Sequence, residues 1–163
     1  IPGLTYGINL GLTLKNFDFN ILFSGLGRYS RNYNDIAQNV KEYIYQGNFY
    51  DYHRNAWTEE RWKSGAKITY PALATEASTS HRSNDFFIQS RSMVRLKNVE
   101  LGYNLPAKLF GKVGVKGLRV YVSGQNLFYF CNNTFSKHLD PEMNDPIGYP
   151  ITKNVMLGFN VNF

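Results

Sequence analysis

The segment LTYGINLGLTL, residues Leu4–Leu14, alternates without a break between two kinds of side chain. Its even positions carry leucine, tyrosine or isoleucine, and its odd positions carry threonine, glycine or asparagine. Because successive side chains of a β-strand point to opposite faces, this pattern predicts a strand with one apolar and one polar face. The polar pair Lys15 and Asn16 then predicts a tight hairpin.

Four further segments alternate in the same way, so we predict an all-β chain. The five expected strands lie at about 4–15, 17–29, 86–105, 118–130 and 151–163. The apolar phase changes at Lys97 and Asn98, which predicts a β-bulge in the third strand. Two long loops remain, 30–85 and 131–150, and the first has one or two expected helical turns at 35–45 with Asp35 as the N-cap.

The lengths of the strands and loops favour a membrane barrel. Strands of about 11–13 residues exceed the usual soluble length of about 5–6 and suffice to cross a bilayer at a tilt. Short and long connections alternate, as at the two rims of an outer-membrane barrel. Aromatic residues are expected in two interfacial belts, one with Phe17, Phe19, Tyr103 and Phe163 and one with Tyr6, Tyr29, Phe86, Phe128 and Tyr149.

We therefore predict an antiparallel up-and-down transmembrane β-barrel with long extracellular loops, and keep a soluble β-sandwich as the alternative. Five strands do not close such a barrel, because bacterial barrels have an even number of strands starting at about 8. We expect residues 1–163 to be the C-terminal part of one larger barrel domain. The longest apolar run, five residues ending at Cys131, is too short for a helical span of about 20.

Composition excludes several other classes of function. The single cysteine, Cys131, excludes an internal disulfide and a cysteine-based zinc site. The net charge of +6 comes from scattered cations, whereas a nucleic-acid binder concentrates them on one face or in one run. We therefore expect no nucleic-acid partner.

No catalytic constellation stands out, so we expect no enzymatic activity and no cofactor. The histidines His53, His81 and His138 are far apart in the sequence, which disfavours a metal site. Carboxylates at 140, 142 and 145 fit a capped turn at Pro141 better than a cation site.

Several segments, in this order, carry a family resemblance: NAWTEERWKSG at 55–65, RLKNVELGYNLP at 95–106, LRVYVSGQNLF at 118–128, DPE at 140–142 and a closing Phe163. Together they resemble the C-terminal end of the SusC/RagA class of TonB-linked outer-membrane transporters of Bacteroidetes, and they cover nearly the whole chain. The resemblance implies a 22-stranded plugged barrel, an N-terminal plug with a TonB box, neither of which is in this sequence, and a SusD-like lipoprotein lid.

The implied function is outer-membrane nutrient import: TonB-dependent uptake of oligosaccharides or peptides together with the lid. The alternative is a soluble carbohydrate-binding β-sandwich module. A sandwich buries its apolar face, so it should stay monomeric without detergent, whereas a barrel segment needs outer-membrane lipid or detergent.

Three groups of residues are candidate functional residues. Exposed aromatic rings stack on sugars or anchor partners, so the binding candidates in the first loop are Tyr50, Tyr52, Trp57 and Trp62; the alternative is that these rings form the loop's own small core. We expect three polar side chains to face the lumen, along the substrate path or against the plug, namely those of Arg28, Arg95 and Gln125. The final aromatic resembles the signal read by the barrel-assembly machinery, which assigns an assembly role to Phe163 with Phe159 and Val161; the alternative is that Phe163 is simply the last lipid-facing side chain.

Overall fold

The computed structural model describes residues 2–34, 49–73, 79, 82, 84–110, 114–143 and 149–163. The chain divides into two compact units. The sheet unit consists of 1–28, 92–131 and 149–163, and the loop unit consists of 29–91 and 132–148. The helical turns expected at 35–45, together with His81 and Asp145, lie outside the described residues. Within the described ranges, no helix is both long and apolar enough to cross a membrane.

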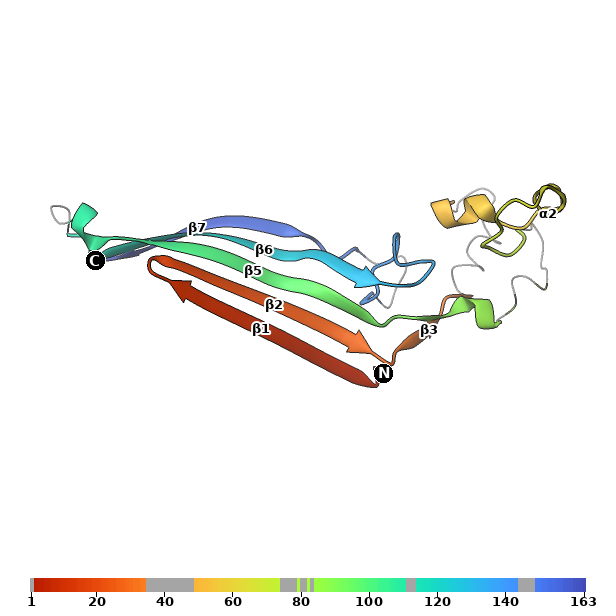
Figure 1. Cartoon of the computed structure of the whole chain (residues 1–163), viewed down its shortest axis with the longest axis horizontal. Helices are drawn as coiled ribbons and strands as arrows, with labels where there is room; N and C mark the ends of the chain where they lie inside the picture. The colour runs from red at the N-terminus through yellow and green to blue at the C-terminus, as the bar shows by residue number, and fades with distance from the viewer. Residues whose placement is uncertain are drawn as a thin grey trace. The chain divides into compact units, whose positions relative to one another are not determined.

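Five long strands form one sheet in the order β1-β2-β5-β6-β7 (Figure 1). Their bounds are Leu4–Leu14 (β1), Phe17–Gly27 (β2), Met93–Leu105 (β5), Gly117–Cys131 (β6) and Asn154–Asn162 (β7). Every neighbouring pair is antiparallel. Strands that follow one another within the sheet are thus neighbours in space, which is the up-and-down order predicted from the sequence.

One end of the sheet carries its short connections. Lys15, with a positive φ of 53°, turns β1 into β2, and the Asn104 N–H closes on the carbonyl of Asn16 at 2.7 Å. At the same end, a short helix η4 (Ala107–Leu109) follows β5. The Lys116 N–H donates to the carbonyl of Asn162 at 2.7 Å, which places the C-terminus at this end as well (Figure 1).

A β-bulge interrupts β5 where the apolar phase changes. Leu96 is opposite Phe23 and Phe128, and Asn98 is opposite Leu22 and Gln125, so the register of both ladders skips Lys97. The extra residue shifts the alternation by one position. Large apolar side chains therefore stay on the same face before and after the bulge, and the bulge predicted at Lys97 and Asn98 is confirmed.

The loop unit consists of short elements. Strands β3 (Ser30–Asn32) and β4 (Ile88–Ser90) form a two-stranded antiparallel ribbon. The unit also contains the helices η1 (Asp51–Asn55), α2 (Glu59–Ser64) and η3 (Asp85–Phe87). Helix α2 starts where the Thr58 hydroxyl accepts from the Arg61 N–H at 3.2 Å, and ends at Gly65 with φ 68°.

Three strand boundaries differ from the sequence-based expectation. The expected strand 86–105 is split, because the side chain of Asn84 caps η3 and Ile88–Ser90 pairs with β3 in the loop unit, so β5 begins only at Met93. The second strand ends at Gly27, just before Arg28 takes a positive φ of 51°. The last strand starts at Asn154 and not at 151.

Candidate functional site

The apolar face of the sheet is continuous across all five strands. One row of the register joins Leu12, Phe19, Leu101, Val122 and Leu157, each directly opposite the next. Their exposed fractions are 63%, 36%, 46%, 43% and 80%. Monomeric soluble proteins rarely leave apolar patches of this extent uncovered, so this face is built to contact a second apolar medium or surface.

The opposite face is polar and carries an ion cluster of three residues from three strands. Arg119 on β6 donates from Nε to Asp18 Oδ2 on β2 at 3.0 Å and from Nη2 to Glu100 Oε1 on β5 at 2.7 Å. Gly102 lies beneath the Arg119 guanidinium, where an added Cβ would collide with it. Charged groups are very costly in an apolar medium, so the ion cluster marks a face that requires polar surroundings.

The residues expected to face the lumen lie in different surroundings. Arg95 is on the polar face, is 1% exposed and stacks on the Tyr129 ring with 5.0 Å between its guanidinium carbon and the ring centroid. Gln125 is exposed on β6, opposite Asn98 of β5 and Asn154 of β7. Arg28 is exposed at the bend that follows β2. Their expected roles on a substrate path remain predictions.

The expected assembly residues lie on or beside β7. Phe159 and Val161 share the apolar face through their partners Val120 and Leu118. Phe163 follows the end of the strand and is 79% exposed. This position fits an assembly role and a lipid-facing role alike, so the assembly role remains a prediction.

The aromatic belts are only partly as expected. At the short-connection end, the Phe17 and Tyr103 rings lie 4.7 Å apart on the sheet. At the other end, Phe128 and Phe130 lie 5.5 Å apart. Two residues assigned to that belt are not in the sheet: Phe86 is in η3 and packs against the core of the loop unit, and Tyr29 lies under Arg91 in the loop unit. Each lies at the end of an expected strand, 17–29 or 86–105, that is not part of the observed sheet.

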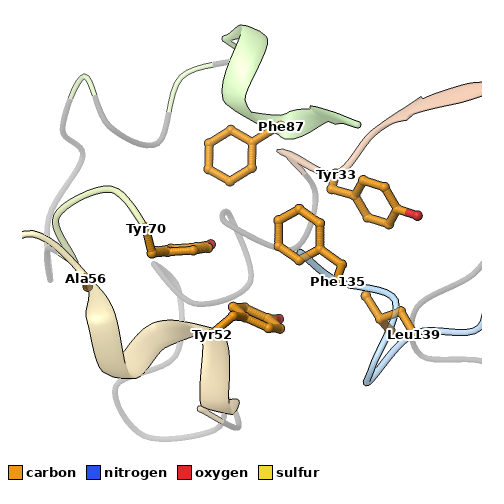
Figure 2. Close-up of a cluster of buried hydrophobic side chains, with 7 residues drawn as sticks. All are labelled: Tyr33, Tyr52, Ala56, Tyr70, Phe87, Phe135 and Leu139. Carbon is orange, nitrogen blue, oxygen red and sulfur yellow. The ribbon is translucent and has the colours of Figure 1, made fainter. Parts of the chain in front are cut away.

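The buried core of the loop unit is mainly aromatic (Figure 2). Its members come from both long loops and are Tyr33, Tyr52, Ala56, Tyr70, Phe87, Phe135 and Leu139. Phe135 has no exposed surface, and its ring stacks on that of Tyr33 at 4.7 Å. The core thus joins residues about a hundred positions apart, which explains how the described parts of the two long connections pack together.

Tyr52 belongs to this core, and Tyr50 packs against it with the two rings 5.4 Å apart. These two binding candidates thus lie in or against the loop's own small core, which is the alternative to a binding role. Trp57 and Trp62 lie outside the core, and Trp62 on α2 is 69% exposed. Of the four binding candidates, only Trp57 and Trp62 have exposed side chains that can contact a partner or a sugar.

Burial sets the protonation of the core. His53 is held neutral, because burial and then the nearby His138 lower its pKa to about 4. Its Nδ1 accepts from the Tyr50 N–H at 2.9 Å. Burial raises the pKa of Tyr70 to about 12, and burial followed by Tyr70 raises that of Tyr52. All three side chains are therefore uncharged at neutral pH.

Two arginines join the parts of the loop unit, and the sequence analysis did not single them out for it. Arg91 is buried, stacks on Tyr29 and donates from Nη2 to the Met143 carbonyl at 2.6 Å. Arg31 donates to the same carbonyl at 3.2 Å. Both carbonyl contacts join residues more than fifty positions apart, so no local pattern reveals them.

The loop unit also contains a polar cleft of about 710 Å³. Its walls are η1, the segment at 67–69, β4 and the turn at 132–138. Within the described ranges, no three histidine, cysteine or acidic side chains are grouped so that they could hold a metal ion. The described part of the Asp140 turn has the geometry of a cap, with the Glu142 N–H donating to Asp140 Oδ1 at 2.9 Å.

Comparison with known proteins identifies relatives along the whole chain. No family model matches. TonB-dependent receptor P3 of Formosa agariphila is 30% identical over 99% of this chain, and TonB-dependent receptor SusC of Bacteroides thetaiotaomicron is 30% identical over 96%. Among solved structures, that of the RagAB peptide transporter covers 99% of the chain with a TM-score of 0.74 and 26% identity.

The chain spans 16% of the length of receptor P3, 15% of SusC and 17% of the RagAB transporter chain. The two-faced antiparallel sheet thus corresponds to part of a larger barrel, as the strand count predicted. The all-β fold, the strand order and these relatives together show that this chain belongs to the SusC/RagA-type TonB-dependent receptors.

Proposed function

We propose that this chain forms a section of the wall, together with two extracellular loops, of an outer-membrane importer. The importer takes up oligosaccharides or peptides, is driven by TonB, and works with a SusD-like surface lipoprotein. Support comes from the receptors named TonB-dependent and from RagAB, a peptide transporter. TonB and the plug would act through regions of the receptor outside these residues.

The two-faced sheet is the observation that carries the proposal. Its apolar row from Leu12 to Leu157 lies next to a polar row in which Asp18 pairs with Gly102 and Gly102 with Tyr121. A barrel wall needs this arrangement, with hydrocarbon on one side and a wet lumen on the other. A soluble carbohydrate-binding sandwich would need a second sheet over the apolar face, where these side chains are exposed.

Within this function the residues have three roles. The apolar face, including Phe159 and Val161, contacts outer-membrane lipid, and Phe163 helps the barrel-assembly machinery recognise the chain. Arg28, Arg95 and Gln125 face the lumen. The exposed rings of Trp57 and Trp62 contact the lipoprotein lid or the incoming substrate, because large aromatic side chains are frequent anchors at such surfaces. Import breaks no covalent bond, so no catalytic residues are assigned.

The test uses the full receptor that contains this sequence, in a host whose own copy is deleted. The double variant Trp57→Ala/Trp62→Ala is compared with Trp57→Phe/Trp62→Phe, which keeps aromatic rings. We expect the alanine variant to reach the outer membrane in normal amounts but to lose uptake or co-purification of the lipoprotein, and the phenylalanine variant to retain most of both. Unchanged uptake and co-purification in the alanine variant would contradict the role of the tryptophans.

The import function itself is tested by deleting the receptor and, separately, TonB. Growth on oligosaccharides or peptides as the sole nutrient should be lost in both deletions. A receptor that fractionates with soluble proteins would contradict the proposal as a whole.

A further inference from the structure

The polar cleft of the loop unit is held in shape by its amide side chains. Gln89 on β4 donates to Thr134 Oγ1 at 3.2 Å and accepts from the Thr134 N–H at 2.8 Å. Asn133 donates to the Ser90 carbonyl at 2.8 Å and accepts from the Phe135 N–H at 2.9 Å. Because these amides are engaged within the protein, they serve as framework and leave the recognition of a ligand to other side chains.

The opposite wall of the cleft is held together by hydrogen bonds between backbone groups. The Thr69 backbone N–H donates to the Asn55 carbonyl at 2.9 Å, and the Trp57 backbone N–H donates to the Tyr70 carbonyl at 2.9 Å. This bridge positions Lys67 and Thr69 against η1. The cleft is therefore a preformed feature of the loop unit, and its volume lies within the range of about 300–1,000 Å³ that is typical of ligand sites.

Two lysines, Lys67 and Lys137, line the cleft. Within the part of the chain that the structure describes, neither Lys67 nor Lys137 has an ion pair or hydrogen bond, and both are exposed. Among the described lining residues the one carboxylate, Asp51, pairs with Arg54 at 3.1 Å. The two lysines thus add two positive charges to a lining whose described negative charge is already paired, so the cleft attracts anions.

The other lining groups favour a hydroxyl-rich ligand. Thr69 and Asn132 are exposed at the cleft, and their side chains offer both donors and acceptors. Among the lining residues that the structure describes, the only aromatic rings are those of Tyr52 and His138, which lie 5.6 Å apart. A peptide with apolar side chains finds little apolar surface here, whereas sugar hydroxyls and acidic groups find matching partners.

We propose that this cleft is a binding site for an acidic oligosaccharide, one that carries carboxylate or sulfate groups, with Lys67 and Lys137 as the residues that select for its charge. This inference rests on the proposed import function and specifies its substrate class. The lysines would hold the acidic groups, and Thr69 and Asn132 would hydrogen-bond neighbouring hydroxyls.

The experiment measures binding to the purified full receptor by calorimetry. The probes are an oligogalacturonate, a sulfated galactan oligosaccharide, a neutral galactan oligosaccharide of equal length and an acidic peptide of equal charge. The test variant is Lys67→Gln/Lys137→Gln. The matched control is Lys63→Gln, which removes another exposed cation of the loop unit, one that does not line the cleft and pairs with Glu59.

We expect at least one acidic oligosaccharide to bind about tenfold or more tightly than the neutral one. The double lysine variant should abolish that preference and flatten its dependence on salt, and the control should preserve both. The proposal is overturned if no acidic oligosaccharide binds, if the double variant binds like the unmodified receptor, or if the acidic peptide binds more tightly. A receptor that still imports a neutral nutrient would then leave the proposed function standing and refute only the charge selection.

Discussion

The sheet unit and the loop unit place their large apolar residues in opposite surroundings. In the sheet unit the apolar row from Leu12 to Leu157 is exposed along its whole length, and the ion cluster of Asp18, Glu100 and Arg119 lies on the other face. In the loop unit the rings of Tyr33, Tyr52 and Phe135 are buried against one another. One unit thus has an apolar exterior and the other an apolar interior.

The two units of the chain are therefore suited to two different solvents. Burial of apolar surface from water drives the loop unit to form a core, at about 25 cal/mol per Å². The sheet has no comparable core among its described residues, and its order comes from backbone ladders and from contact of its apolar face with hydrocarbon. Substitutions should therefore have different effects in the two units.

The largest expected effect is on the core of the loop unit. Phe135→Ala removes a ring with no exposed surface and should destabilise the loop unit by about 3–5 kcal/mol. Limited proteolysis of the full receptor should then cut within 29–91 or 132–148, while the barrel keeps its heat-modifiable mobility on gels. Phe49→Ala, which removes a largely exposed ring, is the control. Equal proteolysis of the two variants would contradict the assignment of the core.

The next effect concerns the lipid face. Leu10→Arg places a charge on the apolar face and should destabilise the folded receptor by about 2–4 kcal/mol near mid-membrane. The neighbouring Asn9→Arg places the same charge on the polar face and should cost much less. Yield of folded receptor in the outer membrane and its urea midpoint are the readouts. If Asn9→Arg were the more harmful variant, the two faces would be reversed.

The third expected effect is a pH dependence of stability that should appear in the loop unit and not in the sheet unit. The folded-state pKa of His53 is lowered from 6.5 to about 4, so the unfolded loop unit binds the proton more readily. Stability from the neutral ring is complete above pH 6.5 and is lost as the pH falls toward 4, by up to about 3 kcal/mol. Protection factors from hydrogen exchange, which correct for the intrinsic exchange rate at each pH, should fall in the loop unit over this range, with no matching change in the sheet. His53→Phe should remove this fall, and persistence of it there would contradict the role of His53.

The smallest effect is expected at the surface of the loop unit. Lys63 and Glu59 pair at 2.6 Å on α2, but both side chains are about 70% exposed. Such pairs are worth about 0.3–0.5 kcal/mol. Glu59→Gln should therefore leave proteolysis of the loop unit almost unchanged. A loss as large as that of Phe135→Ala would show that α2 is part of the core.

The sequence predicted the sheet well because its information is local. Alternation from Leu4 to Leu14 assigns each side chain to a face, and the phase change at Lys97 locates the bulge to the residue. The family was predicted from the resemblance of several segments and from their order along the chain. The boundary at Met93 was missed, because Phe86 and Ile88 continue the alternation although they belong to the loop unit.

The loop unit was not predictable in the same way, because its contacts join distant residues. Nothing near Tyr33 in the sequence indicates that it stacks on Phe135, and nothing near Lys67 indicates that it shares a cleft with Lys137. Tyr52 was a candidate for binding, with a role in the loop's own core as the alternative, and only the structure shows how deeply it is buried.

The central claim is that the even-numbered side chains of β1 face hydrocarbon. The most direct measurement is spin labelling of residues 4–14, one at a time, in the full receptor reconstituted in lipid vesicles. Oxygen, which concentrates in the bilayer, should reach labels at Ile8, Leu10 and Leu12 more readily than labels at Asn9 and Gly11, with a period of two. Equal oxygen access along the strand, or shielding of the even positions as in a protein interior, would contradict the account.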